Sequence, residues 1–268
     1  MVTMIFMFFY KKNLSLIVLI AISACLIFFN IFCFPKNILS WDVFGYYMYL
    51  PMTFIHDNWK LQHIDILHTI IAKYQNTSSL YQAYQTNTGF WVMRYSMGMA
   101  ILYAPFFLIG HFICGFTSFP QDGYSLPYQS AILVGGIIYS IVGVFFLRKI
   151  LIKYFTDGIA AMTLVIIYYG TNYFMHTTFH GQNALSHNYL FTLYTLIIWF
   201  TIKWHETFRM KYIMLLGLFC GLSSIARPSE IVCLLIPLLW EVGTNYSFIE
   251  KMKIIFKMKN QLFIFFFI

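Results

Sequence analysis

The chain of 268 residues is 60% hydrophobic, 21% aromatic and only 10% charged, with a formal net charge of +8. A soluble domain carries about a quarter charged residues, so the composition excludes an ordinary soluble enzyme. The basic residues stand in short clusters between apolar runs, which argues against a nucleic-acid partner. Runs of about 20 apolar residues match the hydrocarbon thickness of a bilayer and predict an all-α, polytopic transmembrane helical bundle.

The first segment, 1–10, is apolar but short and lacks a small-residue cleavage site, so we expect a retained anchor. The longer apolar segments lie at 14–34, 97–119, 130–147, 159–179, 188–202, 212–225, 231–242 and 254–268. No repeat or linker divides them, which favours a single membrane domain over 1–268. The last run stops inside apolar sequence, so we expect an incomplete C-terminus. The five cysteines form no CxxC pair and are predicted to be small buried hydrophobes.

Four basic clusters set the predicted topology. They are Lys11 and Lys12; Arg148, Lys149 and Lys153; Lys203, Arg209 and Lys211; and Lys251, Lys253, Lys257 and Lys259. The positive-inside rule places all four in the cytoplasm, together with the N-terminus. An even number of crossings must then separate the first two clusters. We therefore predict a long extracytoplasmic region, 35–129, in which 97–119 dips in and returns or lies partly along the interface. The alternative is that 97–119 is an ordinary membrane span and that the basic clusters after it do not follow the positive-inside rule.

The stretch "SWDVFGYYMYLP", residues 40–51, follows the first apolar run and carries Asp42. A carboxylate this close to hydrocarbon is costly to ionise unless it is paired or hydrated, which suits a general base. The alternative is a solvated loop carboxylate within an aromatic belt at the interface. The aromatic residues of that belt would be Trp41, Tyr46, Tyr47 and Tyr49.

The rest of the extracytoplasmic region contains three recognisable stretches. Residues 56–74 put apolar side chains largely on one helical side and predict an amphipathic helix on the outer leaflet. Residues 74–91 predict a polar and aromatic loop that faces a substrate. Asp122 and Gly123 mark a turn, with Asp122 kept as a second candidate carboxylate near the membrane edge. His63, Asp65 and His68 are too irregularly spaced to share a helical face, so we expect no metal site.

Two further polar stretches lie between later spans. In "HGQNALSHNY", His187 begins a helix and is predicted either to donate to a phosphate or to cap the helix among the headgroups. In "ARPSE", Arg227 precedes a helix-breaking proline. Its planar guanidinium group can bind a phosphate or a carboxylate through two hydrogen bonds. The alternative is that Arg227 is paired structurally with Glu230.

Together these stretches resemble the GT-C superfamily of membrane glycosyltransferases, which includes protein O-mannosyltransferases and aminoarabinose transferases of lipid A. The segments that carry the resemblance are "WDVFGYYMYLP", "YSMGMAILYAPFFLIGH", "GTNYFMH", "SHNYLF" and "ARPSE". The resemblance covers nearly the whole chain. It departs from the family at Asp42, which is followed by Val43 where a paired acidic residue is usual.

The resemblance implies transfer of a sugar from a polyprenyl-phosphate donor to an acceptor, not identified, on the extracytoplasmic face. Asp42 would be the base on the acceptor hydroxyl, Arg227 would bind the carrier phosphate, and His187 is a weaker candidate for that role. Trp41, Tyr46 and Tyr47 would line the sugar site. Membrane lipids are expected partners, and no cofactor or metal is indicated.

Two other functions stay open on the sequence alone. A transporter or flippase for a lipid-linked or small anionic solute would need charge near mid-bilayer and paired broken helices. Apart from His111 and the breaks in 97–119, the predicted spans lack such features. A non-catalytic membrane scaffold or fragment is the second alternative.

Overall fold

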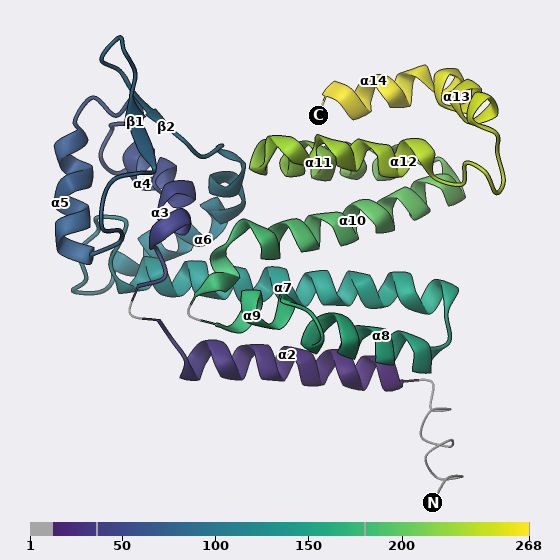
Figure 1. Cartoon of the computed structure of the whole chain (residues 1–268), viewed down its shortest axis with the longest axis horizontal. Helices are drawn as coiled ribbons and strands as arrows, with labels where there is room; N and C mark the ends of the chain where they lie inside the picture. The colour runs from purple at the N-terminus through teal and green to yellow at the C-terminus, as the bar shows by residue number, and fades with distance from the viewer. Residues whose placement is uncertain (1–12, 36, 180, 268) are drawn as a thin grey trace, which may run out of the picture. The chain divides into compact units, whose positions relative to one another are not determined.

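The computed structural model describes residues 13–35, 37–179 and 181–267, and these are mostly helical (Figure 1). The helices are α2 (Leu14–Phe32), α3 (Trp41–Tyr47), α4 (Tyr49–Phe54), α5 (Ile64–Tyr74), α6 (Gly98–Cys114), α7 (Leu126–Tyr154), α8 (Asp157–Tyr169), α9 (Tyr173–Thr178), η1 (Gln182–Ala184), α10 (Ser186–Thr207), α11 (Met210–Ala226), η2 (Pro228–Leu234), α12 (Leu235–Leu239), α13 (Phe248–Lys257) and α14 (Lys259–Phe267). The strands are β1 (Ala83–Gln85) and β2 (Trp91–Met93). The prediction of a helical fold is confirmed.

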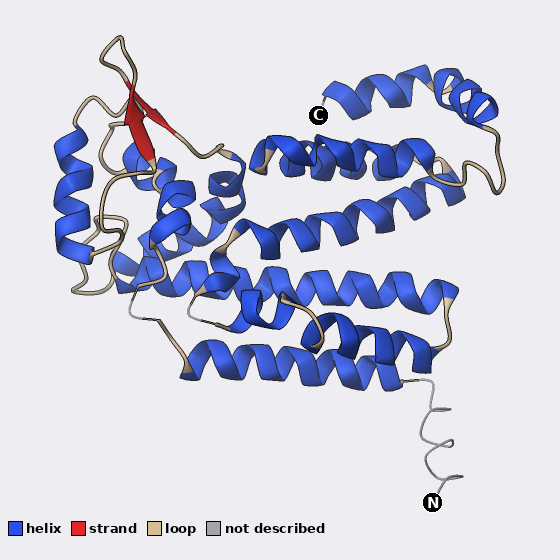
Figure 2. Cartoon of the chain, viewed as in Figure 1, coloured by secondary structure: helices blue, strands red, loops and turns tan. Residues whose placement is uncertain are grey.

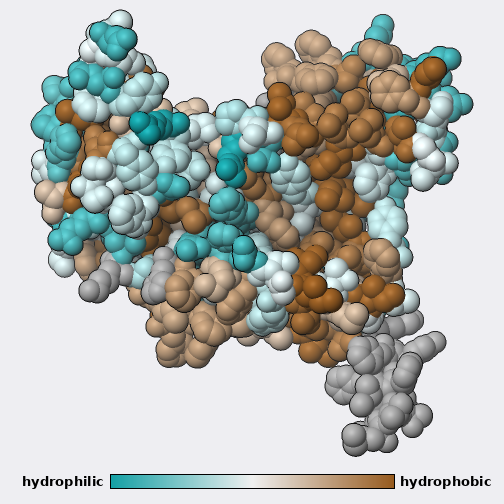
Figure 3. Space-filling model, viewed as in Figure 1, coloured by the Kyte–Doolittle hydropathy of each residue, from teal (hydrophilic) through white to brown (hydrophobic). Residues whose placement is uncertain are grey.

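Within the described residues, α2 and α7 are long and apolar enough to cross a membrane. Shorter apolar helices are α6, α8, α11 and the stretch Pro228–Leu239. Large apolar side chains are exposed along α2 and α8, and hydrophobic surface covers much of the face drawn in Figure 3. Soluble monomers rarely expose large contiguous apolar patches, so this surface agrees with a membrane protein.

Several predicted apolar segments are broken where the sequence carries residues that end helices. The predicted segment 159–179 is divided into α8 and α9 by Gly170, Thr171 and Asn172. Most of the predicted segment 231–242 lies in the short elements η2 and α12, and Pro237 lacks the amide hydrogen that a continuous α-helix would use at that position. Segment 97–119 contains one continuous helix, α6, despite Pro105. Its place relative to a bilayer stays a prediction.

The chain divides into two compact units. The first unit is made of the described part of Met1–Leu19, Val142–Leu164 and Leu190–Ile268. The second unit is made of Ile20–Ile141 and Val165–Tyr189. The predicted extracytoplasmic region lies in the second unit, and so do Asp42 and Asp122, two of the candidate site residues.

In the second unit, the predicted loop 74–91 contains β1, and β2 begins at the last residue of that stretch, Trp91. The two strands pair antiparallel, with Ala83 opposite Met93 and Gln85 opposite Trp91 (Figure 2). The predicted amphipathic helix begins only at Ile64, and Leu67 and Ile70 on its apolar side are buried against protein. Trp59 lies in the turn before that helix and is exposed.

The core of the second unit is rich in buried tyrosines, and the hydroxyls of two of them donate to main-chain oxygens. The Tyr47 hydroxyl donates to the Gly123 carbonyl at 2.6 Å, and the Tyr103 hydroxyl donates to the Ala184 carbonyl. These two bonds stabilise the fold, because an unpaired hydroxyl is costly in an apolar interior.

In the first unit, three polar residues hold the start of α2. The Ser15 backbone N–H donates to Asp157 Oδ2 at 3.1 Å, and the Ser15 hydroxyl donates to Asp157 Oδ1. Arg148 Nε donates to the Ser15 hydroxyl oxygen at 2.8 Å. A carboxylate at a helix N-terminus satisfies free backbone N–H groups and complements the helix dipole.

Candidate functional site

A pocket of about 700 Å³ lies in the second unit beside the start of α3. Two stretches of chain line it, one leading into α3 and one around η1. The lining residues are Pro35, Asn37, Ile38, Ser40, Trp41, Asp42, Val43, Gly181, Gln182 and Leu185. Both Asp42 and Trp41 from the sequence prediction therefore lie at one pocket, and Asp42 is the one carboxylate in this lining.

The backbone at the start of α3 is held in an unusual conformation. Trp41 has φ of 52°, in the left-handed region that a bulky residue rarely adopts. Its N–H donates to the Asn76 carbonyl at 2.9 Å, and its carbonyl accepts from Gln82 Nε2 at 3.0 Å. These two bonds offset the local strain, which is frequent at functional sites. The Trp41 side chain is 58% exposed.

Two tyrosines orient the Asp42 carboxylate. Oδ1 accepts a hydrogen bond from the Tyr95 hydroxyl at 2.5 Å and another from the Tyr81 hydroxyl at 2.8 Å. No described residue donates to Oδ2. Asp42 is exposed. The carboxylate is thus fixed through one oxygen, and the other is available to take a proton from a bound hydroxyl.

Both tyrosines stay protonated at neutral pH. Burial, followed by the hydrogen bond to Asp42, raises the pKa of Tyr81 to about 12. The same causes, in the same order, raise the pKa of Tyr95 above its ordinary value. Each hydroxyl therefore remains a donor to Asp42 over the physiological pH range.

Gly45, one turn after Asp42, makes room for the Tyr95 ring. A Cβ atom on Gly45 would lie 2.3 Å from Tyr95 Cδ2 and 2.5 Å from Cε2. The Tyr46 ring packs on the Tyr95 ring with 4.6 Å between centroids, and the Tyr49 hydroxyl donates to the Tyr95 carbonyl at 2.5 Å. Gly45, Tyr46 and Tyr49 therefore hold in place the Tyr95 ring that orients Asp42.

Gly45→Ala is expected to displace the Tyr95 ring and to remove its hydrogen bond to Asp42. Tyr95→Phe removes only the hydroxyl, worth about 1.5–3 kcal/mol for a bond to a charged group. If the pocket is catalytic, both variants should lower turnover by about tenfold or more without weakening donor binding. Unchanged turnover in Tyr95→Phe would contradict a role for this tyrosine in positioning Asp42.

Two other predicted site residues, Tyr46 and Tyr47, do not line the pocket. Both are buried, the Tyr46 hydroxyl lies 3.4 Å from the Ser186 hydroxyl, and Tyr47 is bonded to the Gly123 carbonyl. Their observed contacts are with protein, and they pack α3 against the core of the second unit.

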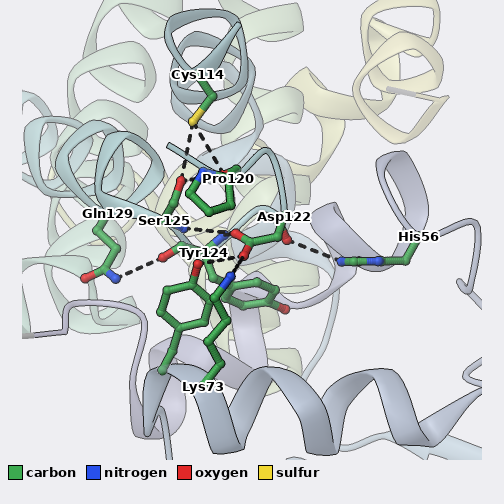
Figure 4. A network of polar contacts seen from close by, with 9 residues as sticks. His56, Lys73, Cys114, Pro120, Asp122, Tyr124, Ser125 and Gln129 are labelled. Atoms are coloured by element: carbon green, nitrogen blue, oxygen red, sulfur yellow. Dashed lines mark hydrogen bonds and ion pairs between the residues drawn. The ribbon is translucent and has the colours of Figure 1, made fainter. Parts of the chain in front are cut away.

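Asp122 lies in a turn with several polar partners (Figure 4). It is not part of the pocket lining. Its Oδ2 accepts from Lys73 Nζ at 2.7 Å and from the Tyr74 hydroxyl at 2.6 Å. Its Oδ1 accepts from the backbone N–H groups of Tyr124 and Ser125. His56 Nε2 donates to the Asp122 carbonyl at 3.3 Å. These contacts support the predicted turn and tie it to α5.

The carboxylate of Asp122 should contribute to stability in a pH-dependent way. Burial alone would raise its pKa, but hydrogen bonds from Lys73, Tyr74 and the Tyr124 backbone outweigh burial, and the net pKa is lowered. A lowered folded-state pKa stabilises the fold above the unfolded value of about 3.9, and this contribution is lost as pH falls through the folded value.

Asp122→Asn should therefore reduce the free energy of unfolding by about 1 kcal/mol at neutral pH, since the Lys73 side chain is half exposed. The deficit should shrink as the pH falls below about 4. Denaturant titrations of both proteins between pH 3 and 7, in the same detergent, measure it. A deficit that does not change with pH would contradict the ion-pair explanation.

His187 lies next to the pocket but not in its lining. Its ring centroid is 5.0 Å from that of His176, and His176 Nδ1 donates to Gln182 Oε1 at 3.1 Å. Gln182 lines the pocket. His187 is thus linked to the pocket through two other side chains, and it is exposed.

Arg227 belongs to the first unit, where it follows the end of α11. The ion pairs among the described residues do not include one between Arg227 and Glu230. The Glu230 carboxylate instead accepts from the Tyr194 hydroxyl at 2.6 Å and from the Ser229 hydroxyl at 3.4 Å. The pairing considered from the sequence is therefore not observed, and a role for Arg227 in phosphate binding stays a prediction.

Within the described parts of the chain, no group of three or more His, Cys, Asp or Glu side chains is arranged to hold a metal ion. The sequence did not single out Tyr81, Tyr95 or Gln182. The aromatic and polar character of 74–91 was the signal for Tyr81, and it predicted a substrate-facing stretch but not the contact with Asp42. No protein-family model, curated protein or solved structure matches this chain.

Proposed function

We propose that the protein transfers a sugar from a polyprenyl-phosphate donor to a hydroxyl acceptor, with Asp42 as the general base. The observation that carries the proposal is the Asp42 pocket. It combines a carboxylate fixed through one oxygen, a second oxygen without a donor among the described residues, and an exposed indole beside it. Aromatic faces pack on sugar rings, and a positioned carboxylate can act as the general base on a hydroxyl.

The proposal places the protein in the inner membrane of a bacterium as a polytopic bundle, with the N-terminus in the cytoplasm and the pocket on the extracytoplasmic side. The apolar helices α2 and α7 and the exposed apolar surface support membrane insertion. The basic clusters support the orientation.

The proposed reaction is a single displacement. Asp42 Oδ2 takes the proton of the acceptor hydroxyl while the acceptor oxygen bonds to the anomeric carbon. The bond between that carbon and the phosphate oxygen breaks, and the polyprenyl phosphate leaves. A cation stabilises the charge on this leaving group without protonating it. Arg227 is the residue proposed for this role, with His187 as the weaker candidate.

The test is the anomeric configuration of the product. Purified full-length protein in proteoliposomes is given a polyprenyl-phosphate sugar of known configuration and a panel of hydroxyl acceptors, and the product is examined by NMR. A product of inverted configuration supports the proposal. Retention would overturn the single displacement, and the absence of product with every donor and acceptor would overturn glycosyl transfer.

A further inference from the structure

Two lysines of the first unit, Lys149 and Lys203, pack on Trp199 near the ends of α7 and α10, and Lys153 joins this cluster through Glu206, which also pairs with Lys203. Lys149 Nζ lies 4.9 Å from the Trp199 ring centroid, and Lys203 Nζ lies 4.8 Å from it. Lys149 Nζ is also 5.1 Å from the Phe145 ring. Ammonium groups are attracted to aromatic faces, which explains how these side chains are held but leaves their charge in place.

The charges of this cluster do not balance. Lys203 Nζ pairs with Glu206 Oε2 at 2.9 Å, and Lys153 pairs with the other oxygen of the same carboxylate. Lys149 has no ion pair among the described residues. Two of the three ammonium groups therefore share one carboxylate and the third pairs with none, so the lysines exceed the carboxylate that they contact by two positive charges. The side chains of Lys153 and Lys203 are about one-third exposed, so an anion can reach them.

The cluster stands where a membrane surface is expected. Lys149 and Lys153 lie in the last turns of α7, a helix apolar and long enough to cross a membrane. Lys203 lies near the end of α10, so the negative ends of two helix dipoles favour lysines here. Exposed Phe145 and partly buried Trp199 add the aromatic side chains typical of headgroup depth.

We propose that this cluster binds the phosphate of an anionic phospholipid headgroup between Lys149 and Lys203. The excess of two charges matches an anion, and the basic residues of neighbouring membrane helices are a known setting for headgroup binding. The apolar faces beside the lysines favour a lipid over a free ion, because they can pack on the glycerol and acyl part of the molecule. None of these lysines belongs to the lining of the Asp42 pocket, and lipid binding by the cluster does not depend on sugar transfer.

The test measures lipid affinity of the purified full-length protein by native mass spectrometry. Phosphatidylglycerol is titrated against phosphatidylcholine, and inorganic phosphate is added in excess as a competitor. We expect a preference for phosphatidylglycerol that excess phosphate does not remove. Equal affinity for the two lipids, or full displacement by inorganic phosphate, would overturn the proposal.

Three variants make the test specific. Lys149→Gln with Lys203→Gln should weaken phosphatidylglycerol binding by about 25-fold, since one lysine near an anionic surface contributes about fivefold. Lys253→Gln with Lys257→Gln removes the same charge from exposed positions on α13 and should leave the affinity within about twofold. Glu206→Gln adds to the excess charge and should tighten binding by about fivefold.

An equal loss of phosphatidylglycerol affinity in the α13 double variant would show that binding depends only on the net charge of the protein, and it would overturn the proposed site. If the Lys149 and Lys203 variant does not fold, the Glu206→Gln variant decides. Tighter binding supports the site, and unchanged or weaker binding with an unaltered unfolding midpoint overturns it.

Discussion

Asp42→Asn is expected to reduce the rate of sugar transfer by about 10²–10⁴-fold while the donor still binds. Asparagine keeps the size of the side chain and can still accept hydrogen bonds from Tyr81 and Tyr95 at its carbonyl oxygen. It cannot accept the proton of the acceptor hydroxyl. Initial rates in proteoliposomes, together with the donor dissociation constant, separate the loss of the base from a loss of binding.

Asp57→Asn is the matched control for this variant. Asp57 is an exposed carboxylate of the same unit, is not part of the pocket lining, and has φ of 46°, which asparagine tolerates well. Its variant should transfer sugar at the wild-type rate. Equal rates for Asp42→Asn and the wild type would remove Asp42 from the chemistry.

Asn188→Ala is expected to lower the free energy of unfolding by about 3 kcal/mol or more, because it removes a buried polar hub. Asn188 Nδ2 donates to the Gly136 carbonyl at 2.9 Å and to the Asn183 carbonyl at 2.8 Å. Its Oδ1 accepts from the Ser140 hydroxyl at 2.9 Å. Without the amide, the carbonyl of Asn183 loses a donor, the Ser140 hydroxyl loses an acceptor, and a cavity remains.

Asn87→Ala provides the comparison for Asn188→Ala, since Asn87 is an exposed residue of the turn between β1 and β2. It should change the unfolding free energy by less than about 0.5 kcal/mol. Denaturant titrations in one detergent measure both. Equal effects of the two substitutions would contradict the claim that the buried hydrogen bonds of Asn188 stabilise the fold.

The helical fold could be predicted from hydropathy, because apolar runs of about 20 residues have the length of a helix that crosses a bilayer. Hydropathy could not show where a run is interrupted, as it is at Gly170 between α8 and α9. The three-residue strands β1 and β2 are too short for an alternating pattern to be visible. The turn at Asp122 was predicted from the Asp-Gly pair, but its partner Lys73 was not.

For the candidate site, the sequence indicated Asp42 from its position after the first apolar run. It could not indicate Tyr81 and Tyr95, which are 39 and 53 residues away and reach Asp42 only in the folded chain. Tyr46 and Tyr47 were predicted to line a sugar site on composition. Their side chains are buried, because the side of α3 on which they lie packs against the core.

Donor specificity tests the central claim of lipid-linked sugar transfer most directly. The labelled sugar is offered to wild-type proteoliposomes on polyprenyl phosphate, as a nucleotide sugar and as the free sugar, with one acceptor panel. Transfer from polyprenyl phosphate alone is the predicted result. Transfer from the nucleotide sugar alone, or from none of the three, would contradict it.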